Sequence, residues 1–203
     1  AGKWTDVSAP IDLVRLEHQA TGNGFNTDSE CVILGWDPAD THTSNFWEEL
    51  ASVDLSGGAA TNIDSGTISA KKYLWIQYYT EQSTDSDFLI TFNADTGSNY
   101  ARRYANDGGT ETTGTGLANF TQVSRTANLP QFTNMFIVNN SANEKLIIAH
   151  TVYQNTAGAG SVPNRWEAVG KWANTSAQIT AMNIKSGSGN LATNTVLKIW
   201  GSD

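Results

Sequence analysis

Oxygen-bearing side chains gather in one short segment, Asn-Ala-Asp-Thr-Gly-Ser-Asn at 93–99. Asn93, Asp95 and Asn99 are spaced to surround a hard cation such as calcium, which prefers carboxylate and amide oxygens around a glycine bend. The segment lacks the second and third carboxylates of a strong calcium loop. An Asp-x-Gly turn that ends the preceding strand accounts for the same residues, and we favour this second interpretation.

Catalytic motifs are missing from the sequence. It contains no Gly-x-Ser-x-Gly elbow, no glycine-rich phosphate loop before a helix and no His-Glu-x-x-His zinc motif. The three histidines lie far apart, and His150 alternates with Ile148 and Val152, which predicts a packed or rim position. We therefore expect a protein without catalytic residues, cofactor or metal. A glycosidase with two carboxylates across a cleft stays an alternative, since any acidic β-protein offers such pairs.

Arginine and tryptophan supply the candidate contact residues. Arg102 and Arg103 lie in Tyr-Ala-Arg-Arg-Tyr, where a strand would point them to opposite sides. One of them is then partly buried and pairs with a carboxylate or with a neighbouring subunit. Trp4 is an apolar anchor near a polar chain start, and with the two arginines it completes our interface candidates. Most other tryptophans should be core, although one or two on an open face could stack on a glycan: Trp36, Trp47, Trp75, Trp166, Trp172 and Trp200.

Charge and composition exclude several classes of protein. Twelve Lys and Arg against 20 Asp and Glu give a net charge of −8, which disfavours binding to nucleic acid and to anionic membranes. Thr, Asn, Gly and Ser make up 78 of the 203 residues, yet 20 aromatic residues argue against disorder. The single Cys31 cannot form an intramolecular disulfide, and its alternating context predicts a buried small hydrophobe. These features favour an extracellular or virion β-protein.

Nearly every periodic segment has the two-residue period of a strand. We predict strands at 11–18, 29–36, 47–55, 61–69, 72–79, 87–93, 117–125, 132–139, 145–153, 166–172, 178–184 and 195–200. The polar run at 140–144 predicts a hairpin turn between two of them. For 44–51 a short helix capped by Ser44 competes with a strand, which we prefer. We expect exposed loops at 106–116 and 155–164.

About a dozen short strands with little helix predict an all-β protein, an antiparallel β-sandwich of the jelly-roll type. No linker separates two cores, so we expect one domain over 1–203. Its terminal segments, 1–20 and 186–203, are candidates for contacts with other subunits. A gapless similarity between 11–37 and 177–203 leaves open whether the two ends are duplicated.

Several segments resemble virion structural proteins of tailed phages. They are Gly-Trp-Asp-Pro-Ala-Asp-Thr-His-Thr at 35–43, Ser-Gly-Thr-Ile-Ser-Ala-Lys-Lys-Tyr-Leu at 65–74, Phe-Asn-Ala-Asp-Thr-Gly-Ser-Asn-Tyr at 92–100, Asn-Asn-Ser-Ala-Asn-Glu-Lys-Leu at 139–146, Gly-Lys-Trp-Ala-Asn-Thr-Ser-Ala-Gln-Ile at 170–179 and the ending Lys-Ile-Trp-Gly-Ser-Asp. The resemblance spans nearly the whole chain, but its motifs are turns and strands, so no functional residue carries over.

The resemblance implies a non-enzymatic protein of the virion surface, first of all a capsid decoration (cement) protein. Its partners would be the major capsid protein or other virion proteins, and copies of itself in a homo-oligomer, for which we prefer a trimer. The alternative is a receptor- or carbohydrate-binding head of a phage fibre or tail, with a possible glycan ligand.

Overall fold

The chain divides into two units, Ala1–Thr43 and Ser44–Asp203. The computed structural model describes residues 13–16, 24, 25, 27, 29–31, 33, 46–122 and 126–203. The described residues of the first unit form no strand or helix. Their large apolar side chains are exposed: Leu13, Val14, Leu16, Phe25 and Ile33.

The prediction that Cys31 is a buried small hydrophobe is wrong. Cys31 is exposed, and its described neighbours at 29, 30 and 33 belong to no strand. Alternation buries a side chain only where a strand pairs into a sheet, and none of the described residues around Cys31 pairs in this way. The strands predicted at 11–18 and 29–36 are also not found in their described halves, 13–16 and 29–31 with 33, which belong to no strand. Other features predicted for this unit lie wholly or largely outside the described residues: Trp4, Trp36, segment 1–20 and the first half of the internal similarity.

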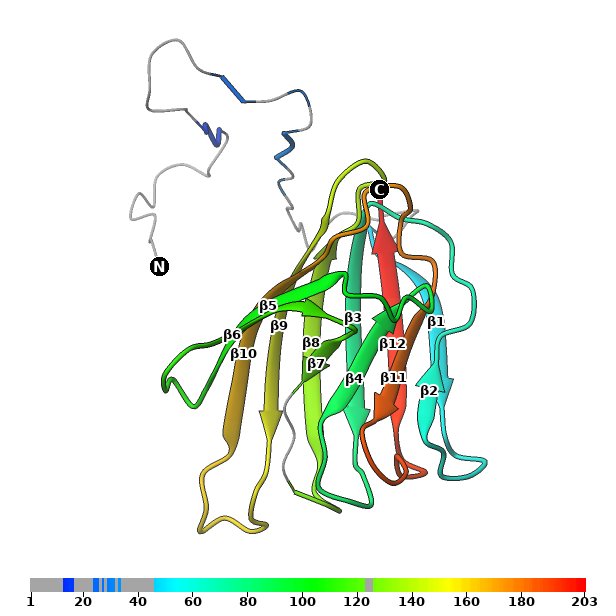
Figure 1. Cartoon of the computed structure of the whole chain (residues 1–203), viewed down its shortest axis with the longest axis vertical. Coiled ribbons are helices and arrows are strands. Elements are labelled where there is room, and N and C mark those ends of the chain that lie inside the picture. Colours follow the sequence, from blue (N-terminus) through cyan, green and yellow to red (C-terminus); the bar gives the residue numbers. More distant parts are fainter. Residues whose placement is uncertain are drawn as a thin grey trace, which may run out of the picture. The chain divides into compact units, whose positions relative to one another are not determined.

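The second unit consists of twelve antiparallel strands in two sheets (Figure 1). The larger sheet has the order β1-β12-β3-β8-β9-β10-β5-β6, and the smaller one has the order β2-β11-β4-β7. The bounds are β1 Glu48–Asp54, β2 Asn62–Asp64, β3 Tyr73–Thr80, β4 Phe88–Phe92, β5 Tyr100–Asn106, β6 Thr112–Leu117, β7 Phe120–Gln122, β8 Gln131–Val138, β9 Lys145–Tyr153, β10 Asn164–Trp172, β11 Met182–Ser186 and β12 Val196–Ser202.

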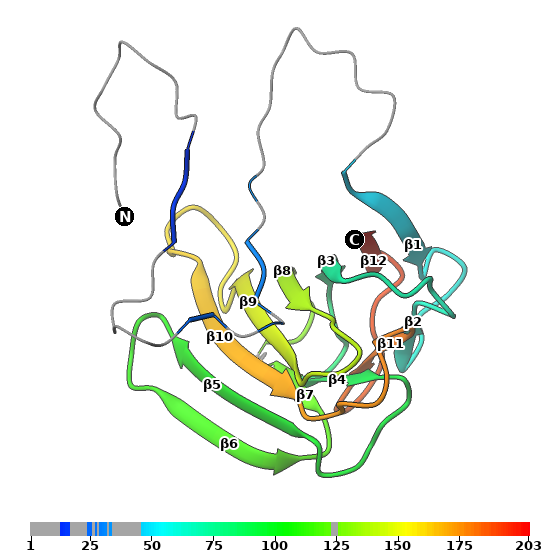
Figure 2. The ribbon, with the colours of Figure 1, turned by 90° about the horizontal axis from the view of Figure 1, so that it is seen from above.

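The four-stranded sheet lies against one face of the eight-stranded sheet (Figure 2). Between them is a core of aromatic and aliphatic side chains that includes Ile76, Phe92, Phe120, Trp166 and Trp172. Among the described residues there is no helix, so the all-β antiparallel sandwich is confirmed. The finer prediction of a jelly roll stays a prediction.

Alternation explains the central strands of the larger sheet. Every second residue of β8 and of β9 is buried, and the intervening residues point away from the core. The turn at 140–144 joins them, as predicted. Residues 48–54 form a strand rather than a helix, which also agrees with the preferred interpretation.

The largest error in the predicted elements concerns 106–116. This stretch was expected to be a loop throughout, but its second half belongs to β6, which pairs with β5. Thr is a good strand former, and pairing with β5 satisfies a backbone whose side chains carry no apolar pattern. β5 was also absent from the predicted strands. The strand expected at 178–184 begins only at Met182.

A lysine is buried at the start of β9. Lys145 is fully buried, and its ammonium donates to the carbonyl oxygens of Asn143 and Asn174, both at 2.8 Å. It also lies 5.8 Å from the ring centre of Trp172. Burial lowers the pKa of Lys145, while the carbonyl oxygens supply the acceptors that a buried ammonium requires. The side chain thereby ties the 140–144 turn to the loop after β10.

A buried hydrogen-bond network joins the two sheets. Gln122 of β7 accepts a hydrogen bond from the Tyr78 hydroxyl and donates to Thr133 Oγ1 at 2.9 Å and Thr151 Oγ1 at 2.8 Å. Burial raises the pKa of Tyr78, so this hydroxyl stays a donor at every physiological pH. One amide from the smaller sheet thus serves three strands of the larger sheet.

We predict that Gln122→Leu lowers the free energy of unfolding by about 2–4 kcal/mol, because three buried hydroxyl groups lose a partner that water cannot replace. Urea denaturation measures the change. Gln77→Leu is the matched control. Gln77 is only partly buried, and its side-chain amide donates a long hydrogen bond, 3.5 Å, to Asn134 Oδ1. An effect of the Gln122 change no larger than that of the control would contradict the stabilising role of the network.

Candidate functional site

The outward-facing side of the eight-stranded sheet carries an apolar row across five neighbouring strands. The strand register places Trp200 of β12, Trp75 of β3, Phe136 of β8, Ile148 of β9 and Val169 of β10 side by side. Phe136, Ile148 and Val169 are 43%, 53% and 50% exposed. We call the outward side of β12, β3, β8, β9 and β10 the outer face.

Parallel rows flank this apolar row on the outer face. One neighbouring row, set by the same register, contains Tyr73, Val138 and Leu146. On the other side comes a polar row: Lys198, Gln77, Asn134, His150 and Glu167. Beyond it the face is largely apolar again: Val196, Tyr79, Phe132, Val152 and, at the end, Arg165. The outer face is therefore striped, with one polar row between apolar ones.

Five aromatic rings lie next to one another in one part of the outer face. The ring centres of Trp75 and Trp200 are 4.9 Å apart, and Phe136 stacks on Trp75 with ring centres 6.0 Å apart. Trp47, just before β1, lies 5.9 Å from Trp75, and Phe46 lies 5.4 Å from Trp47. The Trp75 indole nitrogen donates to Asn134 Oδ1 at 2.5 Å. These five rings form the aromatic cluster.

Tryptophan burial agrees with the prediction only in part. Trp166 and Trp172 are in the core as expected, whereas Trp47, Trp75 and Trp200 are half-buried and point outward. Strand periodicity shows that alternate residues share a face, but in strands apolar on both faces it does not show which face the second sheet covers. That is why the outer face was not found from the sequence.

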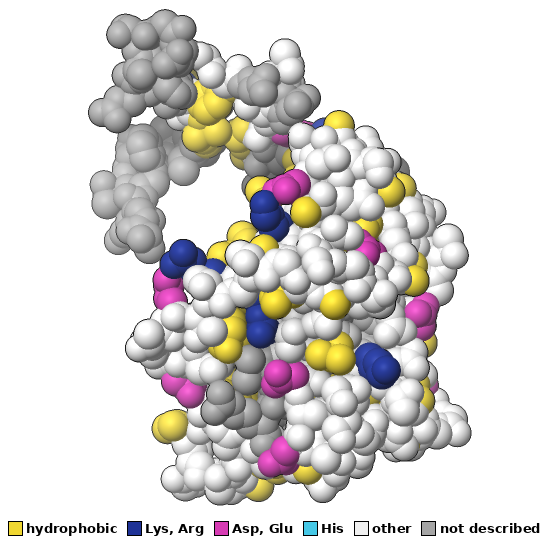
Figure 3. Space-filling model, viewed as in Figure 1, with side chains coloured by type: hydrophobic (Ala, Val, Ile, Leu, Met, Phe, Trp, Pro, Cys, Tyr) yellow, Lys and Arg dark blue, Asp and Glu magenta, His cyan; other side chains and the backbone are white. Residues whose placement is uncertain are grey.

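The opposite side of the sandwich looks different. Over β4, β7 and β11, apolar side chains are scattered among polar ones and gather into no comparable row (Figure 3). On the outer face and its margins, charged side chains are paired within the chain: Lys198 with Glu49 at 3.6 Å, Arg165 with Glu167 at 3.7 Å and Lys171 with Glu144 at 2.6 Å. An apolar centre surrounded by paired charges is typical of a protein–protein interface.

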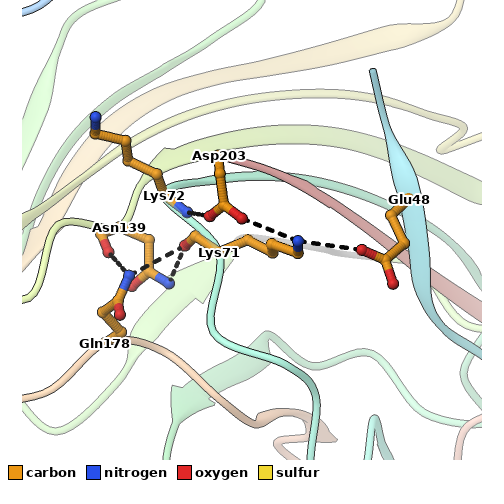
Figure 4. Close-up of polar contacts among 6 residues, drawn as sticks. All are labelled: Glu48, Lys71, Lys72, Asn139, Gln178 and Asp203. Carbon is orange, nitrogen blue, oxygen red and sulfur yellow. Dashed lines mark hydrogen bonds and ion pairs between the residues drawn. The ribbon is translucent and has the colours of Figure 1, made fainter. Parts of the chain in front are cut away.

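At one end of the larger sheet the C-terminal residue is held by ion pairs (Figure 4). Lys71 Nζ lies 2.9 Å from an Asp203 carboxylate oxygen and 3.1 Å from one of Glu48. The Lys72 amide nitrogen donates to the other Asp203 oxygen at 3.3 Å. The pKa of Lys71 is raised by Asp203 and Glu48, and the pKa of Asp203 is lowered by Lys71. The last strand of segment 186–203 is β12, which lies between β1 and β3 and pairs with both.

Beside this group, Asn139 fixes the turn after β8. Asn139 is fully buried. Its side-chain nitrogen Nδ2 donates to the Lys71 carbonyl at 2.8 Å, and its side-chain oxygen Oδ1 accepts from the backbone amide of Ile179 at 2.6 Å. Gln178 Nε2 donates to the Asn139 carbonyl at 2.8 Å (Figure 4). These bonds join the turn after β8 to Lys71 and to the segment before β11.

The two arginines point to opposite sides of β5, as expected. Arg102 is partly buried, donates from Nη1 to the Thr121 carbonyl and lies 4.7 Å from the Tyr104 ring centre. Burial lowers the pKa of Arg102, and no carboxylate of the described residues lies within ion-pair distance of it. Arg103 is exposed and pairs with Glu111 at 2.5 Å. Their role at an interface stays a prediction, and Trp4 lies outside the described residues.

Asp95 acts as the cap of a turn. One of its carboxylate oxygens accepts from the Gly97 amide at 2.8 Å, and the other accepts from Asn99 Nδ2 at 2.9 Å and from the Trp172 indole nitrogen at 2.7 Å. Desolvation works against the charged form, but the bonds from Trp172, Asn99 and Gly97 outweigh it and lower the pKa of Asp95.

The Asn93 side chain does not join the hydrogen bonds around Asp95. Its side-chain oxygen accepts from the amides of Thr180 at 2.8 Å and Ala181 at 3.0 Å. Asn93 and Asp95 thus serve different protein partners, which fits the capped turn better than the calcium loop. No group of three His, Cys, Asp or Glu residues in the described part of the chain could hold a metal ion.

In comparisons with known proteins, no family model, no curated protein and no solved structure matches the chain. None of the described residues belongs to a helix that is long and apolar enough to cross a membrane.

We predict that Asp95→Asn destabilises the protein by about 1–2 kcal/mol at pH 7, because three donors lose a charged acceptor. Since folding lowers the pKa of Asp95 below its usual value of 3.8, the contribution is present above that value and is lost as the pH falls through the lowered pKa. The difference in melting temperature between the two proteins should therefore shrink in acid.

The same pair of proteins tests the calcium interpretation. The capped turn predicts that millimolar calcium leaves both melting temperatures unchanged. A calcium-dependent rise seen only with Asp95 present would contradict the turn and restore the cation site.

Proposed function

We propose that this chain is a non-enzymatic structural protein of a virion, and first of all a capsid decoration (cement) protein that works by binding other protein subunits. The observation that carries the proposal is the outer face, a broad and largely apolar surface on the central strands of an eight-stranded sheet. A catalytic role has no comparable support among the described residues.

The size of the outer face supports an assembly role. Seven large apolar side chains on β8, β9 and β10 are 39% to 57% exposed: Phe132, Phe136, Val138, Leu146, Ile148, Val152 and Val169. At roughly 80 Å² of exposed surface each, they present on the order of 550 Å² in total, of which about 400 Å² lies in the two adjoining apolar rows, within the range of the largest patches that monomers usually expose. A surface of this size favours burial against a partner, because apolar area removed from water contributes about 25 cal/mol per Å².

The virion part of the proposal is supported by the resemblance of the sequence segments and by the composition. Small hydroxyl and amide side chains offer many hydrogen bonds while losing little rotamer entropy on contact. Few charges need to be desolvated, since charged residues are only 16% of the chain. Such a surface suits a protein that bridges neighbouring shell subunits.

We predict that imaging of purified virions places the protein on the capsid lattice in copy numbers that match the shell. Density confined to a few copies at the tail would contradict the decoration role and favour a fibre or tail location. Absence from the particle would contradict the virion assignment altogether.

Substitution on the outer face should release the protein from the particle. We expect Ile148→Asn to lower its occupancy on virions by about tenfold or more, because a buried amide replaces an apolar contact. Leu89→Asn, on the outward side of β4, is the matched control and should bind as the natural chain does. Equal occupancy of the two variants would contradict docking through the outer face.

The aromatic cluster favours a second candidate, a receptor- or carbohydrate-binding head. Half-buried rings of Trp75, Trp200 and Phe136 lie next to hydrogen-bonding side chains, as in sites that stack on sugar rings. Glycan-array binding that Trp200→Ala abolishes would promote this function over decoration. Binding to no glycan would leave decoration as the function of the face.

A further inference from the structure

We propose that the outer face is an interface between two copies of this chain, packed face to face about a twofold axis that runs along β8. This inference deepens the proposed function, because it rests on an assembly role for the outer face and names a second copy as the occupant. The trimer implied by the sequence resemblance is a different arrangement, and the experiment below separates the two.

The first support is the striped pattern. A twofold axis parallel to the strands and lying between two sheets places every row of one copy opposite the same row of the other. Apolar rows then meet apolar rows, and the polar row meets itself. With the axis along β8, Asn134 meets its own equivalent and Gln77 meets His150 of the second copy, and all three side chains carry both hydrogen-bond donors and acceptors.

The second support is charge complementarity. β8 is the middle strand of the five, with β3 and β12 on one side and β9 and β10 on the other. An axis along β8 therefore places β12 of one copy over β10 of the other. In the polar row this brings Lys198 opposite Glu167 of the second copy, twice in each dimer. Lys198 also pairs with Glu49 and Glu167 with Arg165 of its own chain, so each contact adds an opposite charge to an existing exposed ion pair.

The third support is the form of the surface along the axis. Phe132, Phe136 and Val138 are the outward residues of β8 with the most exposed apolar surface, at 41%, 43% and 39%. On the axis each of them meets its own equivalent or a close neighbour. An axis parallel to β8 sets the two β8 strands parallel, and sheets that stack face to face lie about 10 Å apart, a spacing that side chains of this size fill.

The fourth support is area. Five strands span roughly 20 Å at about 4.8 Å per strand, and the rows cover a similar length along the strands. The seven exposed apolar side chains, on the order of 550 Å² in total, approach the ~800 Å² per partner of a standard interface together with the polar row and the paired-charge margin. A second copy that docks through the same outer face buries this area on both partners, so no other part of the surface is needed.

The experiment measures the mass of the full-length chain in solution by sedimentation velocity, over a concentration series and without virions. We expect a dimer of twice the 21.9 kDa chain mass. Lys198→Glu and Glu167→Lys should each weaken the dimer by about tenfold or more, because like charges then face each other at both contacts. An equimolar mixture of the two variants should recover the dimer, since each contact again joins opposite charges.

Lys185→Glu, on the outward side of β11 in the smaller sheet, is the control and should leave the dimer unchanged. A monomer at every concentration, a trimer, or a dimer that none of the outer-face variants weakens would overturn the proposal. Failure of the mixture to recover would exclude the axis along β8. Because no virion is present, a monomer here would still leave docking of the outer face on the particle to be decided by Ile148→Asn.

Discussion

A sheet has two faces, and the smaller sheet of this protein covers only one of them. Four strands pack against eight, so the hydrophobic core accounts for the inward residues of β3, β8, β9, β10 and β12, while the second sheet does not cover their outward residues. Because those residues include Trp75, Phe136 and Ile148, the outer face keeps a large apolar area in contact with water. Docking on the subunits of a virion and packing against a second copy are two ways to bury this apolar area.

The fold could be predicted from the sequence where alternation is strong. β8 and β9 have a strict two-residue period, and the polar run between them fixes the hairpin. β6 could not be predicted, because Thr-Thr-Gly-Thr-Gly carries no apolar period and becomes a strand only by pairing with β5. Lys145 also escaped prediction: the carbonyls of Asn143 and Asn174 that hold it come together only in the folded chain.

The candidate site could be predicted less well than the fold. The segment 93–99 was found and its turn interpretation fits, but the bond from Trp172 to Asp95 joins residues far apart in sequence. The outer face was missed because Trp75 and Trp200 lie in strands that are apolar on both sides. Periodicity assigns residues to faces, whereas only the packing of the second sheet decides which face is core.

The most direct test of the outer face is hydroxyl-radical footprinting of the full-length chain, comparing the dilute protein with its assembled form on virions or in a concentrated oligomer. Oxidation of Phe136 and Leu146 should fall several-fold on assembly, while exposed residues of the smaller sheet keep their rate. Unchanged oxidation of both residues in the assembled state would contradict burial of the outer face and, with it, the account of this protein as one that works by assembly.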